Sequence, residues 1–290
     1  MKLAKTLFAG LLATASLISM LTPAEAVVQR KLKDIHWSFE GPFGTFDRAA
    51  LQRGFQVYKE VCSSCHSLNY LAYRNLADPG GPGFTPAQAE AIAAQAKVPA
   101  GPDDAGDIVD DKGQLLMRAA LPSDHFAKPF LNDNAAKAAN NGSVPPDLTL
   151  MAKAREGGPT YIYSFASGFA DTPQTGRPSC LGETPGQHYN PYFASGALPD
   201  SCKDASGKES VEGSLTAMPP QLTPDRVTYA DGTKATTEQM AMDVATFLAW
   251  AADPHAEERK KLGFEVMIYL FILAGFLYVS YKKVWANIEH

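Results

Sequence analysis

Two stretches with apolar residues at helical spacing frame the polar, loop-rich middle of the chain. The first predicts a helix that starts near Asp47, with Asp47 or Thr45 as its N-cap, and its apolar stripe is formed by Leu51, Phe55, Tyr58 and Cys62. The second follows the capping box Thr236-Thr237-Glu238-Gln239 and ends before Pro254, with one face formed by Met240, Val244, Phe247, Leu248 and Ala251. Within the first helix, Gly54 marks either the close approach of another backbone or a tolerated glycine.

Shorter helices are predicted between these two, separated by clusters of proline and glycine. They span 68–76, 87–96, 134–139, 148–155 and 161–169, and Gly157-Gly158-Pro159 is expected to end the fourth of them. Residues 171–235 are expected to be mostly loop. Because the chain shows neither an internal repeat nor an alternation of strands and helices, the predicted fold is mainly α with long loop insertions.

Two longer apolar runs near the ends predict export and anchoring. Residues 1–26 have the charged start, apolar run and Ala24-Glu25-Ala26 cleavage site of a secretory signal. The run from Leu262 to Tyr281 has 20 residues and one charge, Glu265, which is long enough to cross a bilayer and too long and apolar for most buried helices. We therefore expect a signal peptide (1–26), a periplasmic domain (27–260), a single transmembrane helix in a bacterial inner membrane (261–282) and a cytoplasmic tail (283–290).

The charge balance is mildly acidic. Without Lys2, Lys5 and Glu25 of the signal, 24 basic and 30 acidic side chains remain, a net charge of −6. We expect no nucleic-acid partner. The aspartates between 103 and 111 form an acidic loop, which is more often a solvated surface than a docking site.

The candidate chemistry centres on Cys62-Ser63-Ser64-Cys65-His66. This C-x-x-C-H spacing lets two thiols form thioethers to the vinyl groups of one haem c while the next residue, His66, binds the iron. A thioredoxin-type redox pair would need a strand before a helix, and a four-cysteine zinc site would need a second C-x-x-C. Both alternatives are weaker than haem attachment. We therefore expect one covalently attached haem c per chain.

The remaining cysteines, Cys180 and Cys202, are expected to form a disulfide, because export places them in an oxidising compartment where free thiols are less common. The bridge would close a loop with 21 residues between the two cysteines. The chain-entropy model assigns such a closure about 3 kcal/mol of stabilisation.

The second axial ligand decides between electron transfer and ligand chemistry at an open iron site. Met218 is favoured because Pro219 and Pro220 hold its loop extended in a polar region. The other candidates are less suited to the role: Met117, Met151, Met240, Met242, His36, His125 and His188. A His66/Met218 pair would raise the reduction potential relative to two histidines.

Four stretches of the chain closely resemble the cytochrome c1 family. They are LQRGFQVYKEVCSSCHSL (51–68), AAKAANNGSVPPDLTLMAKAREGG (135–158), AMPPQL (217–222) and the ending DVATFLAWAADP from Asp243 with the anchor after it. The resemblance implies a class I cytochrome c-like helical domain, Met218 as the sixth iron ligand, and Arg155 and Tyr161 at a haem propionate. Cys180 and Cys202 resemble the pair of cysteines that bacterial members of this family join in a disulfide, which steadies the region before the methionine loop.

The resemblance also implies partners. We expect the chain to be a redox subunit of a dimeric quinol:cytochrome c oxidoreductase, the cytochrome bc1 complex. Its partners there would be cytochrome b and a Rieske iron-sulfur protein. On its own the chain is expected to be no enzyme. It would take an electron from the Rieske protein and pass it to a cytochrome c, which the acidic surface would attract. The alternatives are a haem subunit of another membrane respiratory enzyme and a haem enzyme or sensor that binds peroxide or a gas.

Overall fold

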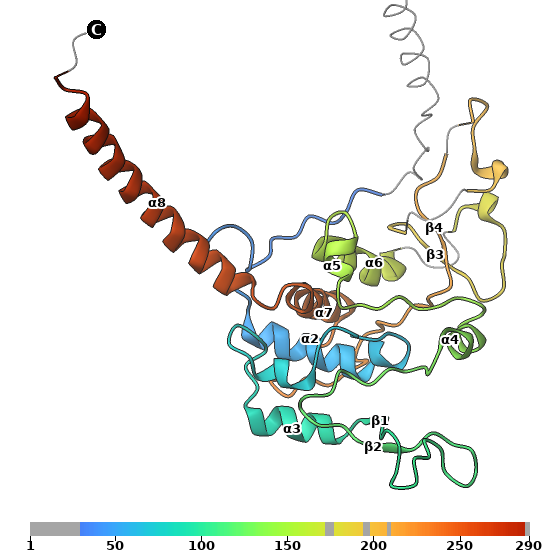
Figure 1. Cartoon of the computed structure of the whole chain (residues 1–290). Helices are drawn as coiled ribbons and strands as arrows, with labels where there is room; N and C mark the ends of the chain where they lie inside the picture. Colours follow the sequence, from blue (N-terminus) through green and yellow to red (C-terminus); the bar gives the residue numbers. More distant parts are fainter. Residues whose placement is uncertain (1–29, 172–176, 194–197, 208–209, 288–290) are drawn as a thin grey trace, which may run out of the picture.

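The computed structural model describes residues 30–171, 177–193, 198–207 and 210–287, and it is mainly helical, as predicted (Figure 1). The predicted signal peptide, residues 1–26, lies outside the described residues. The α-helices in the described part of the chain are α2 (Arg48–Glu60), α3 (Pro86–Ala94), α4 (Asp133–Ala139), α5 (Met151–Ala154), α6 (Pro159–Asp171), α7 (Thr237–Ala252) and α8 (Ala256–Val284).

Helices α2 and α7 form the centre of the core, and they are the two long amphipathic helices predicted from the sequence. Asp47 caps α2 by accepting hydrogen bonds from the N–H groups of Ala49 and Ala50. The helices approach closely at Gly54, where an added Cβ would lie 2.0 Å from the carbonyl oxygen of Asp243. The close-approach interpretation of Gly54 is thus confirmed.

A buried ion pair also joins these two helices. Asp243 is fully buried and accepts a hydrogen bond from Arg53 Nε at 3.0 Å, while Arg53 Nη1 reaches Asp231 Oδ2 at 2.8 Å. Burial raises the pKa of Asp243, and the Arg53 guanidinium opposes that rise. Gln239 donates to the same carboxylate, so its side chain does not complete the predicted capping box, although Thr236 Oγ1 does accept from the Gln239 N–H.

The shorter helices follow the predictions with three differences. Helix α5 is only Met151–Ala154, shorter than the predicted 148–155. Helix α6 starts at Pro159, because a proline tolerated at the first helical position opens this helix instead of only ending the one before it. The stretch 68–76 forms a 3-10 helix over Tyr73–Ala77 alone, since Ala72 is extended and bridges to His125.

Two small antiparallel sheets, which the sequence did not predict, fasten the loops. Strand β1 (Lys97–Pro99) pairs with β2 (Met117–Ala119), and the acidic residues 103–111 lie exposed in the connection between them. Strand β3 (His188–Asn190) pairs with β4 (Ser214–Thr216) and carries a second, smaller apolar cluster that includes Leu181, Tyr189, Leu198 and Cys202.

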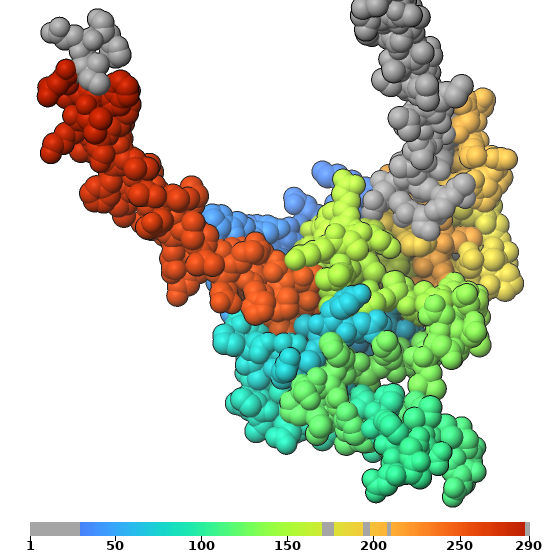
Figure 2. All heavy atoms as spheres, in the orientation of Figure 1, coloured from blue at the N-terminus to red at the C-terminus, as the bar shows by residue number. Residues whose placement is uncertain are grey.

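Helix α8 projects away from the domain (Figures 1 and 2). It is long and apolar enough to cross a membrane, and none of its most apolar window is buried within the protein. It begins at Ala256, before the predicted start at 261, because its first turn packs on the domain.

Candidate functional site

The C-x-x-C-H motif forms a tight turn at the end of α2. The helix ends at Glu60, and a 3-10 turn follows over Cys62–Ser64. The carbonyl oxygen of Cys62 accepts hydrogen bonds from the N–H groups of Cys65 at 3.1 Å and His66 at 2.9 Å. The turn therefore holds both thiols and the imidazole together at the end of a rigid helix.

The ring of His66 is held by a distant backbone group. Its Nδ1 lies 2.8 Å from the carbonyl oxygen of Pro146, 80 residues away, and a carbonyl can only accept, so Nδ1 carries the proton. Burial lowers the pKa of His66 and favours the neutral imidazole. In that tautomer Nε2 has a free lone pair, which is the state needed for binding a metal ion.

The segment that carries Pro146 is in turn fastened to the motif by Asp147. Its Oδ2 accepts from Ser67 Oγ at 2.9 Å and from the N–H of Asn69 at 2.7 Å. Tyr58 adds a contact from α2, donating from its hydroxyl to the carbonyl oxygen of His66 at 3.1 Å. Neither residue was predicted at this site, although Asp147 lies in the stretch 135–158 and Tyr58 belongs to the apolar stripe of the first predicted helix.

The two motif cysteines are unpaired and half-buried. Burial, and to a lesser degree the neighbouring Cys65, raises the pKa of the Cys62 thiol to about 12. A thioredoxin-type cysteine needs a lowered pKa, so this environment argues against that alternative. In the described part of the chain, no three or more histidine, cysteine or acidic side chains form a group that could hold a metal ion.

Met218 lies two residues beyond β4, half-buried, with its N–H donating to Thr216 Oγ1 at 3.2 Å. The other candidate ligands occupy different settings. Met240 is fully buried, Met151 and Met242 pack on the main core, Met117 is 45% exposed on β2, and the side chain of His36 is 92% exposed.

Arg155 and Tyr161 are neighbours, from the end of α5 and the first turn of α6. Burial raises the pKa of Tyr161, and the adjacent Arg155 guanidinium opposes that rise. Arg155 is exposed, and its Nη1 also donates to the carbonyl oxygen of Ala154 at 3.2 Å. The pair presents a guanidinium and a phenol side by side, and both groups can donate hydrogen bonds to a carboxylate.

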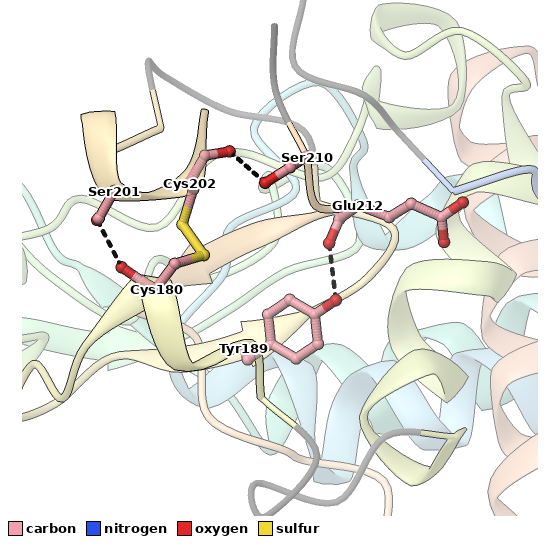
Figure 3. Close-up of a disulfide and its surroundings, with 6 residues drawn as sticks. All are labelled: Cys180, Tyr189, Ser201, Cys202, Ser210 and Glu212. Atoms are coloured by element: carbon pink, nitrogen blue, oxygen red, sulfur yellow. Dashed lines mark hydrogen bonds between the residues drawn. A yellow bond between two sulfur atoms is a disulfide. The ribbon is translucent and has the colours of Figure 1, made fainter. Parts of the chain in front are cut away.

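A disulfide joins Cys180 and Cys202, the pair predicted from the cysteine count (Figure 3). The hydroxyl of Ser201 donates to the carbonyl oxygen of Cys180 at 2.9 Å, and Ser210 Oγ donates to that of Cys202 at 2.8 Å. Tyr189 on β3 donates to the carbonyl oxygen of Glu212 at 2.7 Å, just before β4. These bonds brace the strand that leads to Met218.

The side chains of the C-x-x-C-H turn fit a covalently bound haem, and Met218 is the candidate for the second iron ligand. Two unpaired thiols and a neutral imidazole lie within one turn, and a half-buried thioether follows a braced strand. Thiols, imidazole and thioether are the groups by which proteins attach haem c and ligate its iron.

Comparison with known proteins agrees with this chemistry. The model of the Cytochrome C1 family matches residues 37–288. Cytochrome c1 of Cereibacter sphaeroides is 41% identical over 277 residues, 89% of this chain and 88% of that protein, and cytochrome c1 of Rhodospirillum rubrum is 40% identical over 267 residues, 88% and 87% of the two chains. Cytochrome b/c1 of Bradyrhizobium diazoefficiens is 43% identical over 269 residues, which are 87% of this chain but only 35% of that longer protein.

Proposed function

Since the chain belongs to the cytochrome c1 family, and is thus a haem-bearing, membrane-anchored electron-transfer subunit of a cytochrome bc1 complex, we propose that it takes one electron at a time from the Rieske iron-sulfur protein and passes it to a cytochrome c. The chain alone catalyses no bond chemistry in this proposal. Quinol oxidation belongs to the assembled complex.

Four residues hold the cofactor in this proposal. Cys62 and Cys65 would form the thioethers to one haem c, and His66 and Met218 would supply the ligands of its iron. When bound, haem c supplies a one-electron carrier whose potential the protein sets. The observation that carries the proposal is the hydrogen bond from His66 Nδ1 to Pro146, because it fixes the tautomer and the ring orientation that an axial ligand needs.

The surrounding residues keep that ligand still. Asp147 fastens the segment of Pro146 to Ser67 and Asn69, and Tyr58 fastens His66 to α2. A side chain held from several sides by hydrogen bonds keeps a defined position, as a metal ligand needs. Arg155 and Tyr161 would bind one haem propionate, with the guanidinium facing the carboxylate.

The partners follow from the family and from the charge of the chain. The name of the Bradyrhizobium relative joins b and c1 in one protein, which supports cytochrome b as the neighbouring subunit. The net charge and the exposed residues 103–111 support a basic cytochrome c as acceptor, attracted by the opposite field. We place the haem domain in the periplasm, the end of the chain in the cytoplasm, and the subunit in a dimeric complex.

Purification of the tagged full chain from its native membrane in mild detergent tests the proposal. We expect mass spectrometry to find a multi-span cytochrome b and a Rieske protein, and we expect quinol to reduce the haem only when the Rieske protein is present. Recovery of a different catalytic subunit, or reduction that does not depend on the Rieske protein, would contradict the assignment.

A further inference from the structure

The loop formed by residues 37–46 runs along the first turns of α8 and is fastened there by polar contacts. Phe46 N–H donates to Glu257 Oε1 at 2.7 Å, and Arg48 pairs with the same carboxylate. Lys260 Nζ donates to the carbonyl oxygens of Phe39 at 2.6 Å and Gly44 at 3.1 Å. These contacts attach the loop to the first turns of α8 at two places.

These contacts lie on one face of the helix. Glu257, Lys260 and Phe264 are three and four residues apart, the spacing that places side chains in one row on a helix. The third member of the row packs edge-to-face against Phe43 at the tip of the loop, with ring centroids 5.6 Å apart. The loop thus follows α8 from its polar first turn into its apolar run.

The position of Phe43 relative to the apolar run follows from helix geometry. The run begins at Leu262, and Phe264 is two residues further along. At a rise of about 1.5 Å per residue, this contact lies about 3 Å beyond the start of the apolar run. Lys260 and Lys261 come just before that start, where basic side chains meet lipid headgroups.

The tip of the loop is apolar and exposed. Phe43 is 74% exposed, a large value for an aromatic side chain held in an ordered turn. The turn is closed by hydrogen bonds from the N–H of Glu40 to Trp37 and from the N–H of Thr45 to Ser38, both at 3.1 Å. Figure 2 shows this segment, in blue, beside the base of α8. The turn thus holds an aromatic ring beside the start of the apolar run, and interfacial aromatics lie near the ends of such runs in membrane helices.

We propose that Phe43 inserts into the headgroup and upper acyl region of the membrane and forms a second lipid contact next to α8. The occupant of this surface is lipid, because the tip is continuous with the apolar face of a helix that itself faces lipid. The proposal rests on α8 crossing the membrane. Together with the hydrogen bonds from the loop to Glu257 and from Lys260 to the loop, the inserted ring would fix the tilt of the domain relative to the membrane surface.

A thiol-reactive fluorophore sensitive to polarity tests the proposal. Phe43→Cys is labelled in the purified complex, and the unsubstituted complex, labelled in the same way, gives the background from other thiols. In this chain Cys62 and Cys65 would be used by haem, and the remaining two cysteines form the disulfide. The complex is placed in vesicles of phosphatidylcholine and phosphatidylglycerol that carry a nitroxide high on the acyl chain. Leu131→Cys, 71% exposed, is the matched control on the domain, and Leu273→Cys in α8 is the membrane control.

We expect the label at residue 43 to emit further to the blue than the label at residue 131 and to be quenched several-fold more strongly by the lipid nitroxide. Strong quenching by aqueous iodide at residue 43, equal to that at residue 131, would overturn the proposal. Protection from both quenchers would also overturn it, since a protein subunit would then cover the ring. If the label at residue 273 were not quenched by lipid, the membrane anchor itself would be wrong.

Discussion

The packing of α2 on α7 makes Gly54→Ala a sharp test of the fold. An alanine Cβ at this position would lie 2.0 Å from the carbonyl oxygen of Asp243 and 2.7 Å from Cβ of Phe247. Neither atom is the end of a flexible side chain. Because a carbon and a carbonyl oxygen normally stay about 3.3 Å apart, the helices must separate by about 1 Å.

The cost of that separation can be worked out from two opposing effects. Overpacking a tight core costs typically about 1 to 3 kcal/mol, and the rigid neighbours at residue 54 favour the upper end. Alanine gains about 1 kcal/mol over glycine in helix propensity. The net loss is about 2 kcal/mol, which corresponds to a melting temperature lower by about 4 to 8 °C in a domain of this size.

The assay is thermal unfolding of the full haem-loaded chain in mild detergent, followed by far-ultraviolet circular dichroism. Gly263→Ala is the matched control, because it is also a helical glycine but has no atom within 4 Å of the added Cβ. We expect that control to melt at or slightly above the unmodified chain. If Gly54→Ala melted with the control, the close packing of α2 on α7 would be refuted.

Three further predictions concern the ligand, the disulfide and the buried ion pair. Met218→Leu is expected to lower the haem reduction potential by a few hundred millivolts, which is part of the total range of about 0.8 V over which axial ligands set it. An unchanged potential in a redox titration would exclude Met218 as a ligand. Replacing Cys180 and Cys202 by alanine should lower the unfolding free energy by about 3 kcal/mol in urea titrations, whereas equal stability would show that the loop is ordered without the bridge. Arg53→Met leaves the Asp243 carboxylate buried without its cation and should destabilise the protein by about 3 to 5 kcal/mol. Burial already raises the folded-state pKa of Asp243, and the variant raises it further, so protonation relieves the loss. Stability should therefore recover as the pH falls through this raised pKa, and a loss independent of pH would contradict this.

Much of the helical framework could be predicted because local sequence determines it. The Asp47 cap, the apolar stripe of α2 and the Thr236 cap of α7 are patterns within one or two helical turns. Gly54 could be interpreted because a glycine inside a strong helix weakens it and needs a reason.

What could not be predicted depends on residues far apart in the chain. The cation that pairs with Asp243 is Arg53, 190 residues away, and Arg53 also pairs with Asp231, so only the presence of an acid within an apolar helix hinted at the ion pair. Strands of three residues have too few positions to show alternation, which is why β1 to β4 were not predicted. The hydrogen bond of His66 to Pro146 likewise joins two loops across 80 residues.

The two apolar clusters have a consequence for dynamics. His66 is fixed beside the main core, whereas Met218 follows β4, whose Leu215 packs on the small disulfide-braced cluster. Parts of a protein with separate cores open at different free energies. An iron atom held by both residues would join two cooperative units, so brief opening of the smaller unit would release one ligand while the larger stayed folded. Amide exchange in β3 and β4 should therefore slow when the iron is reduced and binds the thioether more firmly.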